Sequence, residues 1–354
     1  MPKAPPVLAR VYRGPRVESS HRGSVAVVDE RGALLAGCGD PRTPVYVRSA
    51  AKPFQAIPLL EAGGEKKFRL TDEELALMCA SHGGEPKHVQ TAERMLRKGG
   101  FRVSDLECGA HAPMHEASAR DLVRRGAAPT ALHNNCSGKH AGMLLACRLL
   151  GLRREGYVDP AHALQRKIRT TLARYAGIPE SEITVAVDGC NLPVFRLPLS
   201  ALACAYARLV GSRVSGESPA AASGRGRLVK AMSKRPFMVA GSGRFTTDFL
   251  EAGGGRWIGK EGAEGVYAVG LAPAAGARQA VGVAFKIEDG SARPRDAVTL
   301  EVLARLGRLP EAARRTLAAY AEPVVHNARG ANVGRIEADA PIARTAPSRR
   351  KQKK

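Results

Sequence analysis

A serine and a lysine stand three positions apart in the segment RSAAKPFQA, residues 48–56. On a helix, residues at positions i and i+3 share a face, so the Ser49 hydroxyl and the Lys52 amine are expected to point the same way. Serine is a poor nucleophile until a base removes its proton, and an uncharged lysine is one such base. The pattern predicts either a Ser-Lys nucleophile pair or an ordinary surface turn, because Ser-x-x-Lys also occurs by chance.

Pro53 limits where a helix over this segment can begin, because proline is tolerated only in the first turn. We therefore expect the helix to begin near Ser49, where free N–H groups and the helix dipole favour negative charge on the hydroxyl oxygen. Proline also biases the preceding residue, Lys52, away from helical backbone angles. The two effects oppose each other at this position.

A second lysine is needed if Lys52 is to act as a base. The ordinary pKa of lysine, about 10.4, lies far above neutrality, and burial or a second cation lowers it. Two ammonium groups about 4 Å apart at an effective dielectric constant of 20 repel by about 4 kcal/mol, or roughly three pKa units. Lys260, in the glycine-rich segment GKEGAEG, is the candidate second lysine. Ser81, in CASHGGE, is a second candidate serine, although the same letters describe an ordinary turn.

Two further segments contain possible metal ligands. HNNCSGKHAG places Cys136, Lys139 and His140 at the head of an expected helix, and VDGCNLP adds Cys190. By ligand chemistry alone, Cys136, His140 and Cys190 are the set that suits zinc, since a lysine binds metal only when deprotonated. Two alternatives stay open. Cys136 could be a nucleophile with His140 as its base, or both cysteines could be structural core residues.

The arrangement of expected elements indicates one α+β domain. Helices and strands mix without a βαβ rhythm or an internal repeat. We expect a single catalytic domain over residues 1–343, with two lobes as the alternative, and a disordered basic tail over residues 344–354. The expected elements are a β-hairpin over 23–40, helices over 49–64, 71–80, 88–100, 138–152, 159–178, 197–210 and 226–236, a loop over 215–227, an interrupted strand over 182–200, and strands over 257–272 and 279–290.

The composition narrows the class of partner. The net charge is +22, but the tail alone holds six basic residues and no acid. The other basic residues are scattered and form no nucleic-acid-binding motif, so we expect no specific nucleic-acid partner; a non-enzymatic, basic nucleic-acid-binding protein is kept as an alternative. No apolar run reaches the roughly 20 residues of a membrane helix, and the opening residues lack a secretory signal. The seven cysteines, an odd number, suit the reducing cytoplasm.

Taken together, these motifs resemble one family. SSHRG, RSAAKPFQA, MCASHGGE, NNCSGKHAGML, DGCNLP, KEGAEG and KIEDG occur in the order found in the Rhizobium-type, third-class L-asparaginases, the asparaginase II family. The resemblance covers about residues 15–290. It implies a fold similar to serine β-lactamases and penicillin-binding proteins, with a mixed sheet and flanking helices. It also implies a homodimer that hydrolyses L-asparagine to L-aspartate and ammonia.

The resemblance further implies two Ser-Lys tandems, Ser49 with Lys52 and Ser81 with Lys260. The expected reaction is acyl transfer: Lys52 takes the Ser49 proton, Ser49 attacks the side-chain amide, ammonia leaves, and water hydrolyses the β-aspartyl ester. Arg48 is expected to bind the substrate α-carboxylate, because a guanidinium fork fits a carboxylate. A β-lactam- or peptide-directed hydrolase shares the Ser-x-x-Lys motif and is the main alternative, although such an enzyme would need an export signal.

For the metal, the resemblance implies zinc on Cys136, Lys139 and Cys190, with water in the open position and Asp188 close to the substrate. This set replaces the His140 of the ligand argument by Lys139. The zinc is expected to shape the pocket or to orient the substrate. The paired glycines of SHGGE depart from the family pattern, in which bulkier residues stand.

Overall fold

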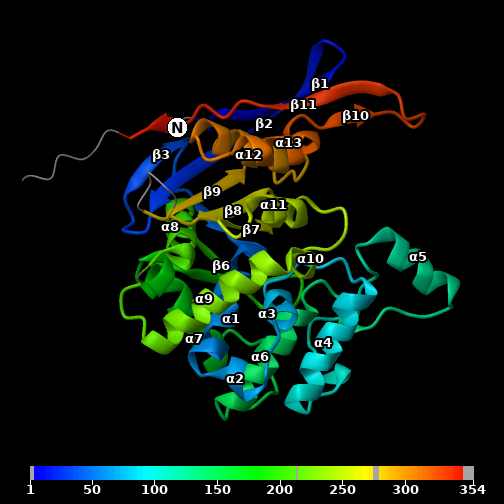
Figure 1. The fold of residues 1–354 in the computed structure, drawn as a ribbon, viewed down its shortest axis with the longest axis vertical. Coiled ribbons are helices and arrows are strands. Elements are labelled where there is room, and N and C mark those ends of the chain that lie inside the picture. The colour runs from blue at the N-terminus through cyan, green and yellow to red at the C-terminus, as the bar shows by residue number, and fades with distance from the viewer. Residues whose placement is uncertain (1–3, 213, 274–278, 346–354) are drawn as a thin grey trace, which may run out of the picture.

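The computed structural model describes residues 4–212, 214–273 and 279–345. A curved antiparallel sheet lies at one end of the molecule, and a larger body of helices lies below it (Figure 1). Helices α12 and α13 cover the other face of the sheet. The structure thus confirms a mixed α+β architecture. Residues 346–354, most of the expected basic tail, lie outside the described residues.

Within the described residues the main sheet has nine strands in the order β10-β11-β1-β2-β9-β8-β7, with β3 branching from β2 and β12 pairing with β3. The hairpin expected over 23–40 corresponds to β2 and β3. The edge strand β7 carries Lys260. The strands are β1 (Val7–Arg13), β2 (Arg16–Asp29), β3 (Leu34–Cys38), β7 (Trp257–Gly262), β8 (Val266–Leu271), β9 (Val281–Ile287), β10 (Val324–His326), β11 (Asn332–Ala338) and β12 (Ala343–Arg344).

The two faces of the sheet belong to different cores. Successive residues of a strand point to opposite faces. On β2, Val25 and Val27 pack into the smaller core with α12, while Ala26 and Val28 pack into the larger core with the helical body. Because both faces are buried, β2 is apolar along its second half and does not alternate with polar residues.

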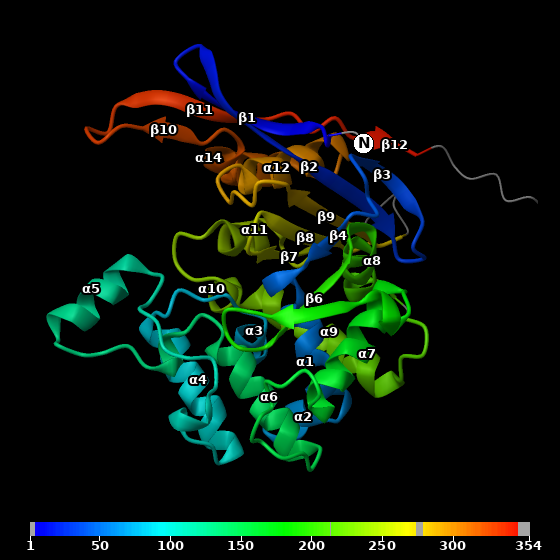
Figure 2. The same cartoon turned by 180° about the vertical axis from the view of Figure 1, so that it is seen from behind.

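A separate three-stranded sheet, in the order β4-β6-β5, lies below the main sheet on the side of α1 (Figure 2). It consists of β4 (Pro44–Tyr46), β5 (Thr184–Val187) and β6 (Pro193–Pro198). The chain leaves β4 directly into the 3₁₀ turn η1 (Arg48–Ala51), and the loop from β5 to β6 contains Asp188 and Cys190. The small sheet therefore brings two segments with expected site residues to one place.

The helices supply most of the larger core. Those of the body are α1 (Lys52–Glu61), α2 (Gly64–Lys67), α3 (Asp72–Met78), α4 (Pro86–Gly99), α5 (Glu116–Arg124), α6 (Ser137–Leu149), α7 (Ala163–Ala176), α8 (Leu199–Val210), α9 (Pro219–Lys234) and α10 (Pro236–Val239). Those near the sheet are α11 (Phe245–Gly253), α12 (Arg295–Arg305), α13 (Glu311–Thr316) and α14 (Ala318–Ala321). Helix α5 extends away from the body (Figure 1).

Helix α8 lies directly on the sheet because two strand glycines leave room for its backbone. A Cβ atom on Gly282 would stand 1.7 Å from the Ala203 carbonyl oxygen, and one on Gly270 would stand 2.6 Å from that of Tyr206. The Tyr206 hydroxyl donates to the Ala50 carbonyl at 2.8 Å. Sheet packing therefore also fixes the turn that contains Ser49.

Most expected elements are present, with one correction at α9. The expected capping box of Thr71 and Glu74 opens α3. Residues 215–227 were expected to form a loop, but α9 begins at Pro219, where the Ser218 side chain accepts from the Ala221 N–H. The many small residues of this segment are typical of a loop, which is why a loop is predicted there. The Ser218-Pro219 pair, however, is a helix-start signal.

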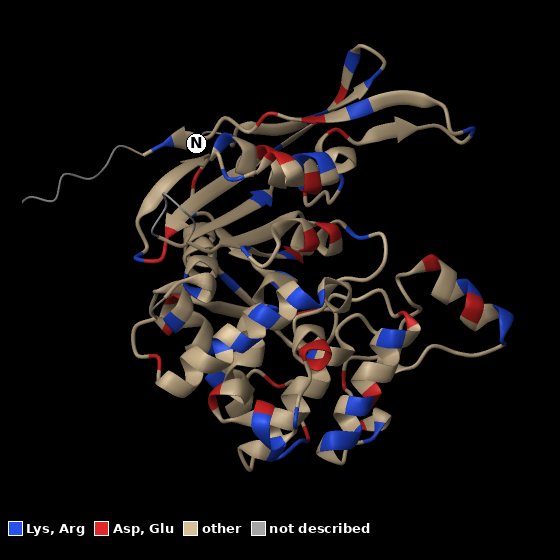
Figure 3. Cartoon of the chain, in the orientation of Figure 1, with Lys and Arg blue, Asp and Glu red and all other residues tan. Residues whose placement is uncertain are grey.

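Two findings concern the whole described chain. No helix in the described ranges is both long enough and apolar enough to cross a bilayer. Basic and acidic side chains are interspersed, and α4 and α5 each carry both signs (Figure 3).

Candidate active site

Two buried lysines converge on one serine. Ser81 Oγ lies 3.0 Å from the Lys52 Nζ atom and 2.8 Å from the Lys260 Nζ atom. The two amines are therefore no farther apart than these distances combined. The exposed fractions are 1% for Lys52, 0% for Lys260 and 6% for Ser81, so this cluster is shielded from bulk water.

Three separate elements position the cluster. Lys52 is the first residue of α1, Ser81 follows the end of α3, and Lys260 lies in the middle of β7. The Lys52 amine also donates to the Ala80 carbonyl, which anchors it beside Ser81. The turn after Ser81 is held by His82, whose Nδ1 accepts from the Gly84 N–H at 3.1 Å.

The electrostatics of Lys260 favour an amine that changes charge near neutrality. Burial lowers its pKa to about 7; the Glu261 carboxylate opposes this shift and the Lys52 charge adds to it. The sequence predicts a lowered pKa for Lys52. In the structure, burial lowers the pKa of the Lys260 amine, which is completely enclosed.

Ser49 lies next to this cluster in the 3₁₀ turn η1. The Lys52 N–H bonds the Ser49 carbonyl, which is the i→i+3 bond that brings both side chains to the same side. Ser49 is half-buried. Among the described residues its hydroxyl has no hydrogen-bond partner, and the Lys52 amine bonds Ser81 instead. The helix start agrees with the Pro53 argument, since α1 begins at Lys52 with proline in its first turn.

Arg48 forms an ion pair with Asp188. Its Nη2 atom lies 2.8 Å and its Nε atom 3.0 Å from the same Asp188 Oδ1. The backbone φ angle of Arg48 is +48°, in the left-handed region that costs a non-glycine residue free energy. Such strain is concentrated at functional sites. Arg48 and Asp188 are both expected to bind substrate, but in this structure they bind each other, and the guanidinium of Arg48 is paired with the Asp188 carboxylate.

The expected metal ligands are brought together. The Lys139 amine lies 3.2 Å from the Cys190 sulfur, and Cys190 is the hydrogen-bonding neighbour that most strongly lowers the pKa of the Cys136 thiol. The exposed fractions of Cys136, Lys139 and Cys190 are only 5–6%. Two sulfurs and one nitrogen fit the donor set of zinc with a fourth position open. Within the described ranges, no group of three or more His, Cys, Asp or Glu side chains is arranged to hold a metal ion.

His140 lies on a different side of α6 from this set. Its Nδ1 atom is 2.6 Å from the Tyr157 hydroxyl, and its Nε2 atom is buried without a partner in the described structure. The Tyr157 hydroxyl also accepts from the Glu107 N–H at 3.0 Å. The ligand argument that favoured His140 over Lys139 therefore does not match the geometry, because consecutive helical residues point about 100° apart.

Sequence reasoning did not single out Glu261. Its carboxylate lies 3.0 Å from the Lys260 amine and accepts from the Thr246 hydroxyl at 2.7 Å. The only signal in the sequence was its place beside Lys260 in GKEGAEG. That signal is misleading on a strand, where neighbouring side chains point to opposite faces.

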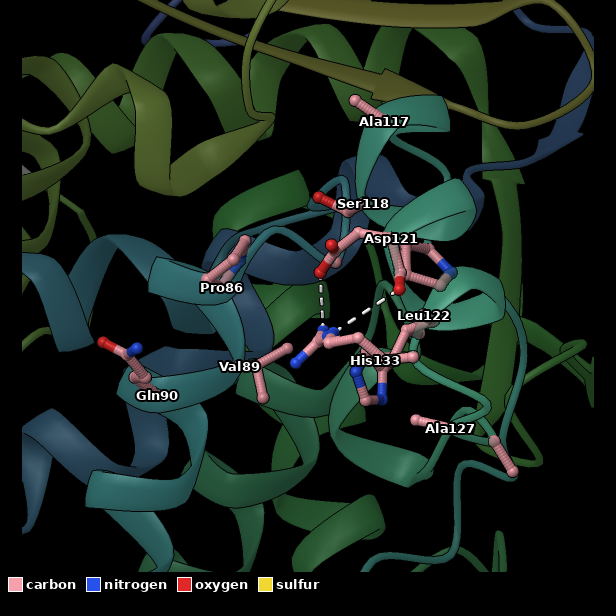
Figure 4. Close-up of a pocket in the computed structure, with 13 residues that line it drawn as sticks. Pro86, Val89, Gln90, Ala117, Ser118, Asp121, Leu122, Ala127 and His133 are labelled. Atoms are coloured by element: carbon pink, nitrogen blue, oxygen red, sulfur yellow. Dashed lines mark hydrogen bonds and ion pairs between the residues drawn. The ribbon is translucent and has the colours of Figure 1, made fainter.

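Two hollows lie near the site. A groove of about 1240 Å³ reaches Arg48 and is lined also by Arg196, Glu264 and Lys286. A second hollow of about 560 Å³ lies between α4 and α5. Figure 4 shows His133 and Asp121 among the side chains around it. None of the expected site residues lines this second hollow, although Gly84 of the turn after Ser81 does.

Comparison with known proteins identifies the chain. It belongs to the L-asparaginase II family, whose model matches residues 9–338. No curated protein matches it.

Solved structures give only distant similarity. The crystal structure of Mglu in its glutamate form has 15% identity and a TM-score of 0.34, over 81% of this chain and 60% of that one. Mglu in its native form has 15% identity and a TM-score of 0.35, over 82% of this chain and 66% of that one. The chain thus spans about 60% of the length of the first of these structures.

Proposed function

We propose that this protein is an L-asparaginase that hydrolyses the side-chain amide of L-asparagine through a Ser-Lys acyl-enzyme. The observation that carries the proposal is the contact of Ser81 with the amines of both Lys52 and Lys260. A buried amine that is neutral near pH 7 is the base that a serine nucleophile requires. Membership of the L-asparaginase II family supports the amide as substrate.

We assign the nucleophile to Ser49. Its hydroxyl has no partner within the described structure and it is half-buried, so a substrate carbonyl has access to it. Ser81, by contrast, is enclosed between two N–H donors. Ser81 and Lys260 are then the path by which a proton taken up by Lys52 moves on.

The reaction has two stages, the acylation of Ser49 and the hydrolysis of the resulting ester. Lys52 removes the Ser49 proton, the Ser49 oxygen bonds the amide carbon, and the carbon–nitrogen bond breaks. The protonated lysine supplies the proton with which ammonia leaves. Water then attacks the ester and gives a proton to Lys52, the bond between the acyl carbon and the Ser49 oxygen breaks, and Lys52 returns that proton to Ser49 as aspartate leaves. Lys260, whose pKa is about 7, can hold either charge state at neutral pH, and it can exchange the proton with Lys52 through the Ser81 hydroxyl.

Arg48 and Asp188 are proposed to bind the polar end of the substrate. A guanidinium suits the α-carboxylate, and a carboxylate suits the α-ammonium group. In this proposal substrate is inserted between the paired side chains, which are 2.8 Å apart in its absence. Both charges are then satisfied with and without ligand, which limits the free energy lost on binding.

Zinc on Cys136, Lys139 and Cys190 is proposed as a bound cofactor. When bound it would supply a Lewis acid. The chain's own contribution is to hold the two sulfurs and the amine together between α6 and the loop from β5 to β6. The Lys139 amine must lose its proton to bind, so zinc uptake releases protons.

A fold similar to serine β-lactamases remains part of the proposal. Two features support it: Lys52 opens a helix buried at the centre of the molecule, and Lys260 lies on the sheet's edge strand beside that helix start. A cytoplasmic location and a homodimer are likewise proposals that come from the cysteines and the family resemblance. Light scattering on the purified chain would measure its oligomeric state.

Ammonia release from a panel of amides tests the function. We expect L-asparagine to be the best substrate, ahead of D-asparagine and L-glutamine, and nitrocefin to be left intact. Turnover of nitrocefin without ammonia release from L-asparagine would instead support the β-lactam-directed alternative. Failure of the whole panel, with and without added zinc, would refute the proposal.

A further inference from the structure

Glu261 is the one carboxylate that contacts the two-lysine cluster in the described structure. Its Oε1 atom lies 3.0 Å from the Lys260 Nζ atom, and its own carbonyl oxygen accepts from the same amine at 3.2 Å. With Ser81 at 2.8 Å, the amine has three oxygen neighbours. The exposed fraction of Glu261 is 6%, so a charge there is not a surface feature.

A neutral amine and an ammonium group can both satisfy this arrangement. An ammonium group has three N–H donors, one for each oxygen. A neutral amine has two N–H donors, which can go to the two Glu261 oxygens, and a lone pair that faces the Ser81 hydroxyl. In either charge state Glu261 therefore directs the remaining N–H or the lone pair of the amine at the Ser81 hydroxyl, so that a proton can pass between the two groups.

The carboxylate is itself held from behind. The Thr246 hydroxyl donates to Oε2 at 2.7 Å, and Thr246 also lies 3.1 Å from the Tyr267 hydroxyl. Arg244 Nη2 lies 3.5 Å from Oε1. These contacts come from the start of α11 and from β8, so two further elements fix the position of Glu261.

The charges around the pair keep Glu261 ionised. Burial raises the pKa of its carboxyl, but Lys260 first, then Arg244 and Arg295, lower it further, to about 2. The other titratable groups that face Glu261 and Lys260 are Lys52 on α1, Cys79 at the end of α3, Tyr206 on α8, Tyr267 on β8 and Asp296 on α12. A buried carboxylate that stays charged across the working pH range is a constant attraction on the Lys260 proton.

We propose that Glu261 is a positioning residue of the active site, which orients the Lys260 amine toward Ser81 and allows that amine to be protonated and deprotonated during turnover. The role rests on the proposed Ser-Lys function. Without the carboxylate, nothing would oppose the effect of burial and of the Lys52 charge on Lys260, so the amine would accept a proton less readily at working pH.

The titration of Lys260 tests this role without any substrate. In the full chain labelled with ¹⁵Nζ-lysine, the Lys260 resonance is the one absent from Lys260→Met. We expect Glu261→Gln to move its titration down by at least about one pH unit, because an attractive charge about 3 Å away is removed. Glu251→Gln, the same change at an exposed position of α11, should leave it unmoved.

Kinetics provide the second readout. For Glu261→Gln we expect the acidic limb of kcat/KM to move down by the same amount and kcat at pH 7 to fall about a hundredfold. Glu261→Asp keeps the charge but shortens the reach. We expect it to lower kcat about tenfold and to leave KM within twofold of the value for the parent chain. The titration of Lys260 should move by less than one pH unit.

These outcomes separate the role from the function. An unmoved Lys260 titration in folded Glu261→Gln, or unchanged kcat in Glu261→Asp, would overturn the proposed role. If Glu261→Gln does not fold, Glu261→Asp decides alone. If the parent chain releases no ammonia, the proposed function fails, while the resonance titration still decides what Glu261 does to Lys260.

Discussion

Lys260 and Ser81 are 179 residues apart in the chain, yet the Lys260 amine lies 2.8 Å from the Ser81 hydroxyl. The Lys52 amine, carried by a third element, lies 3.0 Å from the same hydroxyl. No segment of the sequence contains this arrangement. It arises because strand β7 lies against the turn that begins α1.

The first prediction concerns pH. Since the pKa of Lys260 is about 7, below its ordinary value near 10.4, the amine is charged below pH 7 and neutral above. If the neutral form is active, kcat/KM for L-asparagine rises with pH through about 7 and is flat above. In Lys260→Arg, kcat/KM should be lower by at least about a hundredfold at every pH, since arginine stays charged. Lys230→Arg, at an exposed position of α9, is the control. A profile independent of pH between 5 and 9 would contradict the assignment.

The second prediction concerns Arg48. Arg48→Lys keeps the positive charge but loses the two-atom contact with a carboxylate. We expect KM for L-asparagine to rise about tenfold or more, with kcat changed less than threefold and little effect on the melting temperature. Arg42→Lys, at an exposed arginine in the loop before β4, serves as its control. An equal loss in kcat, with KM unaltered, would mean that Arg48 does not hold the ground-state substrate.

The third prediction concerns metal. We expect about one zinc per chain by elemental analysis, reduced by more than half in Cys136→Ser, Cys190→Ser and Lys139→Met. His140→Gln should keep its zinc, because His140 bonds Tyr157 rather than Cys190. Zinc lost from His140→Gln but retained in Lys139→Met would reverse the ligand assignment.

The fourth prediction concerns the packing of α8 on the sheet. Gly282→Ala should destabilise the fold by about 3 kcal/mol or more, since its Cβ would meet the Ala203 carbonyl oxygen at 1.7 Å and backbone must move. Gly226→Ala, in α9 with no atom within 4 Å of the added Cβ, should instead stabilise by about 0.5–1 kcal/mol. Urea unfolding of the two variants measures the contrast. Equal midpoints would show that α8 can move at little cost.

Sequence reasoning succeeded where one short segment holds the whole signal. The Thr71–Glu74 capping box, the proline in the first turn of α1 and the β2–β3 hairpin are all local patterns. Motif order identified the family, which the match over residues 9–338 confirms. Elements after residue 290, including β11 and its pairing with β1, were not predicted, because pairing between the two ends of a chain leaves no local pattern.

The sequence named most of the residues that the structure brings together here, but it did not predict all of their contacts. Ser81 with Lys260 and Lys139 with Cys190 are paired as expected. The bond from Lys52 to Ser81 instead of Ser49, and the contact of Arg48 with Asp188, depend on side-chain directions that spacing alone does not fix. Glu261 was missed because a strand pattern separates it from Lys260, whereas the long lysine side chain reaches its carboxylate.

Rapid quenching with acid during turnover of L-asparagine, followed by peptide mass mapping, tests the central claim most directly. The account predicts a β-aspartyl ester on the peptide that contains Ser49, absent from Ser49→Ala, which should release ammonia at least about a thousandfold more slowly. An ester on Ser81, or a Ser49→Ala variant with the activity of the parent chain, would contradict it.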